Sequence, residues 1–354
     1  MSGKSCSKTK VLIFFWKHTT PYSARKGDIE EVKPIVGNII KREKPDLIFF
    51  EGGNPRYEIL SKNLLKKIYG RNWREKIEVE YDRARKYANE ECIKELRIDI
   101  ETVKDRWIKH RINYVRHCEE GDLKKARVES RNYFKYDYVF HFYREKGIVR
   151  RIKELAREYK HNKIFIMIGA AHLPLYYELK DAGFEVQIYG DIKQFYPRRR
   201  FLKERRKRLV YPPGIQALPP MTAIYVEERI RGTSVKEFWR KVEEDANKKS
   251  DVVEKRYDLE ILQEALRSHI FFYLRRVKKV ISLRKISVIS NYHTHFIDEE
   301  IIREIFSRIR ERCVMERKKY LDSEEVGSIV VQLLKEKGRW EGKRILKRPI
   351  REIF

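Results

Sequence analysis

The chain has 354 residues, of which 42% are hydrophobic, enough for a substantial core in one large domain or two ordinary ones. Its 81 Lys and Arg residues against 53 Asp and Glu residues give a formal net charge of +28, which favours anionic partners such as nucleic acid, acidic lipid surfaces or polyphosphates without choosing among them. The apolar runs are far shorter than the roughly 20 residues of a membrane span.

The sequence also allows predictions about the cellular location of the protein, about structural zinc and about its working temperature. The first ten residues are polar and basic with no long apolar run after them, so we expect no signal peptide and a cytoplasmic location. The four cysteines form no Cys-x-x-Cys pair, which argues against a structural zinc knuckle. Abundant Lys, Arg, Glu and Ile with scarce Gln resembles a protein built for high temperature.

The first fifty residues predict a strand, a helix and a second strand. Val11–Trp16 is an unbroken apolar run, typical of a strand buried on both faces, and His18 follows it closely. Residues 27–44 carry apolar side chains at helical spacing. Leu47–Phe50 is the second apolar run, and Glu51 follows directly. This order implies parallel neighbouring strands joined by a right-handed crossover.

The next hundred residues predict helices, with no strand. Apolar residues recur at helical spacing in four segments, and Gly70 and Gly121 are natural breaks between them. The segments are Tyr57–Ile68, Arg83–Leu96, Ile100–Cys118 and Leu123–Tyr159. The aromatic side chains of residues 133–143 are expected in the core.

A third apolar strand begins at Lys163 and leads to Gly169-Ala170-Ala171-His172. The small residues allow a close approach of the backbone, and the histidine stands at the carboxyl end of the strand, where ligands bind in open α/β sheets. A helix over residues 173–182, a stop at Gly183 and a strand over 185–190 complete this half.

The second half opens with a basic segment and is mostly helical. Its basic residues are Arg198, Arg199, Arg200, Lys203, Arg205, Arg206, Lys207 and Arg208. They could hold phosphates of a polyanion or nucleic acid, or form a solvated linker, and proline and glycine at 212–220 mark a domain boundary. Residues 286–289 are predicted as a short strand or a bend, beside a weak two-histidine metal site at His293 and His295.

Three strand ends therefore carry His18, Glu51 and His172. Adjacent strands of a parallel sheet are about 4.8 Å apart, so these side chains could converge on one point. Two imidazoles and a carboxylate suit a divalent metal with open positions for water. Without a metal, a histidine could act as base and a carboxylate could orient it. The alternative is three unrelated polar residues at strand ends.

The motifs resemble those of the TraB/PrgY/GumN family and its TIKI-like relatives, within the wider erythromycin-esterase/ChaN-like superfamily. The likeness is carried by Phe15-Trp16-Lys17-His18, by Lys44–Glu51 with Arg56, by Arg144-Glu145, and by Gly169-Ala170-Ala171-His172-Leu173-Pro174. It covers residues 8 to about 192. Three departures stand out: Phe15 replaces the early glycine, Glu145 replaces Asp or Asn, and Leu175 replaces a frequent glycine.

The resemblance implies a metal-dependent hydrolase acting on a peptide or an ester. His18, Glu51 and His172 would bind a divalent metal or serve in acid–base catalysis. Arg144 would steady an anionic transition state or pair with a carboxylate, beside Glu145. The alternative is a non-catalytic protein that binds nucleic acid or an anionic surface through a degenerate hydrolase-like domain.

The expected fold is α/β, with a mainly parallel central sheet flanked by helices. We expect an α/β domain over residues 1–195 with a long helical insertion at about 56–160. A basic, proline-containing connector over 196–221 and a mostly helical C-terminal extension over 222–354 complete the predicted organisation.

Overall fold

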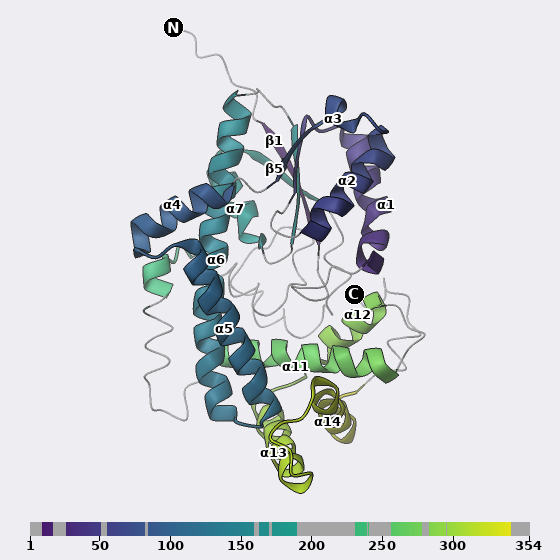
Figure 1. Ribbon diagram of the computed structural model, residues 1–354, viewed down its shortest axis with the longest axis vertical. Helices are drawn as coiled ribbons and strands as arrows, with labels where there is room; N and C mark the ends of the chain where they lie inside the picture. The colour runs from purple at the N-terminus through teal and green to yellow at the C-terminus, as the bar shows by residue number, and fades with distance from the viewer. Residues whose placement is uncertain are drawn as a thin grey trace. The chain divides into compact units, whose positions relative to one another are not determined.

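The fold is taken from a computed structural model of the chain (Figure 1). It describes residues 9–16, 26–50, 55–81, 84–158, 163–169, 172–189, 231–238, 240, 256–277, 283–294 and 296–340. The chain divides into two compact units: unit 1 comprises residues 1–100 and 141–192, and unit 2 comprises residues 101–140 and 193–354. The domain limits expected from the sequence, including the connector at 196–221, stay predictions.

Unit 1 is built on a parallel sheet of five strands, which confirms the α/β prediction. The strands are β1 (Lys10–Trp16), β2 (Leu47–Phe50), β3 (Glu78–Tyr81), β4 (Lys163–Gly169) and β5 (Glu185–Tyr189). Their spatial order is β3-β2-β4-β1-β5, so β4 lies in the middle and pairs with both β1 and β2. The carboxyl ends of the three apolar strands therefore meet at one edge.

Helices cover both faces of this sheet, which is why its central strands are apolar without alternation. They are α1 (Lys26–Glu43), α2 (Pro55–Tyr69), α3 (Trp73–Lys76), the second half of α6 (Leu123–Glu158) and α7 (Pro174–Asp181). Helix α4 (Ala84–Leu96) packs on α6 instead. Figure 1 shows α1 and α2 on one side of the sheet, with α7 and this part of α6 on the other. Leu12, Ile48 and Phe165 of the strands form one core cluster with Val36 and Ile40 of α1.

The prediction of helices alone between residues 55 and 159 is wrong, because strand β3 lies within this range. Its four residues, Glu-Val-Glu-Tyr, alternate polar and apolar at the edge of the sheet, a pattern too short to stand out. Glu80 is nevertheless buried, because Arg151 of α6 reaches it with Nη2 at 3.1 Å from Oε2. A buried ion pair thus joins the edge strand to α6.

The amino ends of β2 and β4 are joined by hydrogen bonds from the turn before β2. The backbone N–H of Asp46 donates to the Lys163 carbonyl oxygen, and the backbone N–H of Lys163 donates to Oδ2 of Asp46, both at 2.9 Å. These two bonds fix the amino ends, away from the strand ends where the site was predicted. Tyr189, the last residue of β5, donates to Glu43 Oε1 at 2.8 Å, and this bond lowers the pKa of Glu43.

Unit 2 is helical in its described residues. It contains α5 (Ile100–Glu119, from Glu101 onward), the first half of α6, α11 (Arg256–Val277), α12 (Leu283–Thr294), α13 (Glu299–Met315) and α14 (Ser323–Glu336). The predicted strand or bend at 286–289 is wrong, because these residues lie inside α12. None of the helices in the described ranges is long and apolar enough to cross a membrane.

The predicted breaks between helices are confirmed by backbone geometry. Gly70 and Gly121 have φ of 87° and 73°, and Gly183 has φ of 92°, a region that side chains with a Cβ rarely occupy. The aromatic side chains between 133 and 143 are mostly buried, as expected for core residues; Tyr138, for example, stacks on Phe238 at 3.9 Å between ring centroids.

Candidate functional site

The sheet order brings the three predicted strand ends together as far as the structure describes them. Trp16 at the end of β1 is the register partner of Gly169 in β4, and Phe50 at the end of β2 is the partner of Met167. His18 follows Trp16 by two residues and Glu51 follows Phe50 directly, but both lie outside the described residues. Of the predicted metal ligands, only His172 is therefore placed.

His172 lies between the end of β4 and the start of α7. Pro174 takes the first position of α7, where a missing N–H costs nothing, so the chain turns from strand to helix within a few residues. The imidazole is only 1% exposed. A buried imidazole needs polar partners, and α6 supplies them.

Helix α6 presents three polar side chains at helical spacing. His141, Arg144 and Glu145 stand at positions i, i+3 and i+4, which share one face of a helix. Arg144 and Glu145 are buried, whereas His141 is half-buried. The pair that the sequence singled out therefore points inward, toward His172.

The two ring nitrogens of His172 face opposite charges. Nη1 of Arg144 lies 3.3 Å from Nε2, and Oε1 of Glu145 lies 3.7 Å from Nδ1. A guanidinium has only donors, so Nε2 must accept this hydrogen bond. The proton of the neutral ring then sits on Nδ1, on the side of the carboxylate. The arrangement holds His172 in one tautomer.

Glu145 is the group that completes this arrangement. Its Oε1 is buried and accepts no hydrogen bond from the described part of the chain, and the Nδ1–H of His172 lies somewhat beyond hydrogen-bonding distance from it. A shift of less than 1 Å would make the bond. A carboxylate in this position orients an imidazole and stabilises its protonated form.

His141 is the residue of this site that the sequence reasoning missed. Its ring lies beside the ring of His172, with 4.8 Å between centroids and 45° between planes. Because His141 is half-buried and His172 is buried, His141 is the more accessible of the two imidazoles. Its spacing of three residues from Arg144 was the available signal, readable once the face of α6 toward β4 is known.

The described residues do not by themselves fit a metal ion. They contain no group of three His, Cys, Asp or Glu side chains placed to hold one. Nε2 of His172 also faces the cationic guanidinium of Arg144, which disfavours a second cation at that nitrogen. The predicted ligand set therefore depends on His18 and Glu51, outside the described residues.

The weaker candidate at His293 has a structural role. This side chain is buried in α12, where Nδ1 lies 2.7 Å from the carbonyl oxygen of Ile289, and its ring stacks on Trp340 at 3.8 Å. Burial lowers the pKa of His293 to about 4, so it stays neutral. His295 lies outside the described residues.

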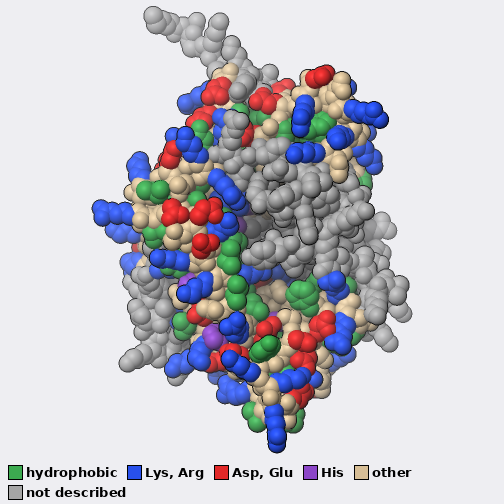
Figure 2. Space-filling model, viewed as in Figure 1, with side chains coloured by type: hydrophobic (Ala, Val, Ile, Leu, Met, Phe, Trp, Pro, Cys, Tyr) green, Lys and Arg blue, Asp and Glu red, His purple; other side chains and the backbone are tan. Residues whose placement is uncertain are grey.

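The basic segment at 198–208 also lies outside the described residues. Elsewhere the positive charge is dispersed: Figure 2 shows Lys and Arg side chains over the described parts of the drawn face, with Asp and Glu among them. Many acidic side chains of the described residues are paired with basic ones, as Glu90 is with Arg150 and Glu304 with Arg308.

Comparison with known proteins gives no relative: no family model, no curated protein and no solved structure matches the chain. The likeness to the TraB/GumN family thus rests on the motifs quoted above and stays a prediction.

Proposed function

We propose that unit 1 is a hydrolase of the TraB/GumN type, with His172 as the acid–base group at the centre of its active site. The observation that carries the proposal is the contact of His172 with Arg144 and Glu145 at the carboxyl end of β4. The resemblance named the same three residues from two separate motifs, with Arg144 and His172 standing 28 residues apart. Their proximity supports a common role.

The proposed reaction uses the two sides of the imidazole differently. Without substrate, Arg144 donates to Nε2 of His172. When substrate binds, its carbonyl oxygen takes over the hydrogen bond from the guanidinium of Arg144. Nε2 of His172 is then free to take a proton from water. The resulting hydroxide attacks the carbonyl carbon. Arg144 stabilises the oxyanion that forms, and Glu145 stabilises the imidazolium.

The second half of the reaction returns the proton. The tetrahedral intermediate collapses and expels the alcohol or amine, which receives the proton held on Nε2. The carbonyl product then carries the oxygen of the water molecule, and His172 is neutral again. The group that leaves decides whether the substrate is an ester or a peptide, and both remain within the proposal.

The proposed reaction includes no step on a metal, because the described residues do not fit one. A divalent metal held by His18, Glu51 and His172 stays a prediction of the sequence, as does a cytoplasmic location. If such a metal is bound, it would supply Lewis-acid chemistry at this edge of the sheet.

The experiment is hydrolysis of a panel of 4-nitrophenyl esters and quenched peptides by the 354-residue chain, with metal content measured on the same samples. His172→Gln and Glu145→Gln should lower kcat/KM by about 100-fold or more, the usual contribution of an acid–base group. His110→Gln is the matched control, because His110 also pairs with a glutamate, Glu129, but lies in unit 2. Activity that survives chelation would favour the metal-free reaction.

A wild-type protein that hydrolyses nothing in the panel, or a His172→Gln variant with full activity, would contradict the proposal. A second measurement needs no substrate: nitrogen-15 NMR of the His172 ring should show the proton on Nδ1. Arg144→Met should release that preference, whereas a ring already protonated on Nε2 in wild type would refute the assigned tautomer.

A second candidate function, binding of nucleic acid or another polyanion through the basic connector, is favoured by the net charge of +28. It predicts that replacing Arg199, Arg200, Arg205 and Arg206 with Ser weakens binding to DNA, RNA and heparin alike and flattens the salt dependence. The matched control replaces four exposed lysines of unit 1, namely Lys41, Lys66, Lys67 and Lys94. Equal losses in both variants would mean that the connector is no specific site.

A further inference from the structure

The corner between α13 and α14, residues 314–320, exposes several apolar side chains. The apolar side chains earlier in α13 are buried instead. Ile301, Ile305 and Ile309 of α13 are buried, as expected for its inner face. At its end, however, Val314 is 73% exposed and Met315 is 77% exposed. Tyr320, just beyond, is 55% exposed. Single exposed apolar residues are common, but three within seven positions concentrate apolar surface at one corner.

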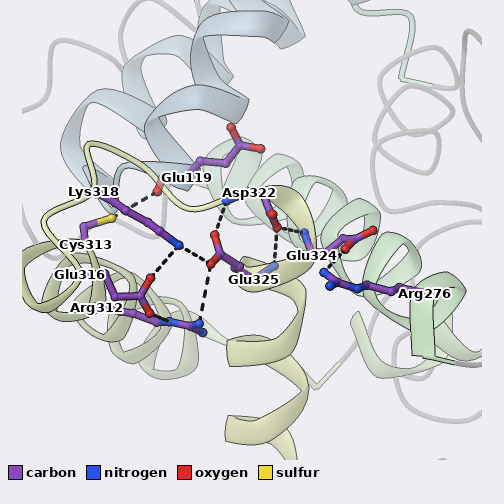
Figure 3. A network of polar contacts seen from close by, with 9 residues as sticks. All are labelled: Glu119, Arg276, Arg312, Cys313, Glu316, Lys318, Asp322, Glu324 and Glu325. Carbon is purple, nitrogen blue, oxygen red and sulfur yellow. Dashed lines mark hydrogen bonds and ion pairs between the residues drawn. The ribbon is translucent and has the colours of Figure 1, made fainter.

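This corner is held in place by charged side chains, shown in Figure 3. Lys318 Nζ lies 2.7 Å from a carboxylate oxygen of Glu316 and 2.7 Å from one of Glu325, and these bonds raise its pKa. Arg312 Nε donates to Glu316 Oε1 at 2.6 Å. The network thus joins the last turn of α13 to the first turn of α14.

Backbone contacts fix the corner further. Asp322 and Glu325 form a capping box at the start of α14, with Asp322 Oδ1 accepting from the Glu325 N–H at 2.8 Å. Leu321 is buried, and its N–H donates to the Glu119 carbonyl oxygen at 3.0 Å. The exposed apolar side chains therefore stand on a defined turn that the protein maintains despite their contact with water.

The local charge of the corner is positive. Glu316 and Glu325 are neutralised by Arg312 and Lys318. Arg317 and Lys319 are exposed, and neither has an ion-pair partner in the part of the chain that the structure describes. Two unpaired cations thus stand among three exposed apolar side chains.

We propose that this corner, residues 314–320, docks the protein onto a membrane surface that contains acidic lipids. Aliphatic side chains gain by leaving water for the boundary between headgroups and acyl chains, and neighbouring cations gain from anionic headgroups. A nucleic acid would use stacking side chains, and the corner offers one aromatic ring among its apolar residues. The proposal does not rest on the hydrolase, and it concerns a different segment from the basic connector.

The test is co-sedimentation of the 354-residue chain with phosphatidylcholine vesicles, with and without phosphatidylglycerol. Val314→Ser/Met315→Ser should weaken binding to the acidic vesicles about tenfold, since both side chains would otherwise be buried at the interface. The control Ile112→Ser/Val128→Ser removes two exposed apolar side chains elsewhere in unit 2 and should change binding less than about twofold.

Charge is tested in the same way. Arg317→Gln/Lys319→Gln and the control Lys109→Gln/Lys124→Gln each remove two exposed positive charges of unit 2, so total charge is matched. Only the first should weaken binding to acidic vesicles by more than about tenfold, and both should unfold at the wild-type temperature.

Three results would overturn the proposal. The wild type could fail to bind acidic vesicles, or the corner variants could bind no more weakly than their controls. The corner variants could also lose affinity for single-stranded RNA while keeping their affinity for vesicles, which would assign the corner to nucleic acid.

Discussion

Gly147 of α6 should be intolerant of the smallest side chain, because α4 passes directly over it within unit 1. A Cβ atom at this position would lie 2.4 Å from the carbonyl oxygen of Ala84 and 2.9 Å from the backbone nitrogen of Ala88. Ordinary contacts of a Cβ atom begin at 3.4 Å, so Gly147→Ala must move one helix backbone by about 1 Å.

The size of the effect follows from two opposing terms. Overpacking of a rigid contact costs about 1–3 kcal/mol, while alanine gains about 1 kcal/mol over glycine in a helix. Gly147→Ala should therefore lower the free energy of unfolding by up to about 2 kcal/mol. At Gly37 in α1 the nearest atom to a new Cβ would be Ile68 Cδ1 at 3.8 Å. Gly37→Ala should then stabilise unit 1 by up to about 1 kcal/mol.

Native-state hydrogen exchange measured on peptides of α4 and α6 is the suitable assay, because a chain with two units need not unfold in one step. A change of about 1.4 kcal/mol in the free energy of opening changes the opening equilibrium tenfold. Exchange in these helices should therefore be faster in Gly147→Ala and slower or unchanged in Gly37→Ala. Slower exchange in Gly147→Ala would refute the close approach of α4 and α6.

Three further predictions concern buried or paired charges. Burial lowers the pKa of His269 to about 4 from its ordinary 6.5, so only the unfolded chain takes up the proton in that interval and unit 2 should lose stability as pH falls from 6.5 to 4. His269 should contribute about 3 kcal/mol of this loss, levelling off below pH 4, and His269→Leu should remove that share in denaturant titrations, while the similar share from His293 remains. Asp322→Ala should cost about 1–2 kcal/mol in thermal unfolding through loss of the cap, whereas Asp322→Asn should keep most of it. Arg151→Met should cost about 3 kcal/mol or more by leaving Glu80 buried without its partner, and adding Glu80→Gln should restore much of the loss in the same assay.

The strands that organise the sheet were predictable from the sequence. Val11–Trp16, Leu47–Phe50 and the run from Lys163 are apolar at every or nearly every position because helices cover both faces of the sheet. Helix ends were predictable for an equally local reason, since Gly70 and Gly121 take up backbone conformations that other residues avoid. Such signals lie within a few neighbouring residues.

Two elements were not predictable, because their surroundings decide their conformation. Strand β3 is four residues long and half acidic, and it forms because β2 offers an edge and Arg151 neutralises Glu80. Three of the residues 286–289 are β-branched, which favours a strand locally, yet the segment belongs to a helix whose Ile286 and Ile289 are buried. Tertiary packing outweighs a weak local preference in both cases.

For the candidate site, the sequence by itself determined that His172 ends a buried strand and that Arg144 and Glu145 stand together on a helix. Only the tertiary structure decided that the helix lies against that strand, that the guanidinium faces Nε2 and the carboxylate faces Nδ1, and that His141 joins them. The reason is physical. Spacing along the chain defines which residues share a face of a helix, but the direction of that face depends on packing, such as the contact of Gly147 with α4, between residues far apart in the sequence.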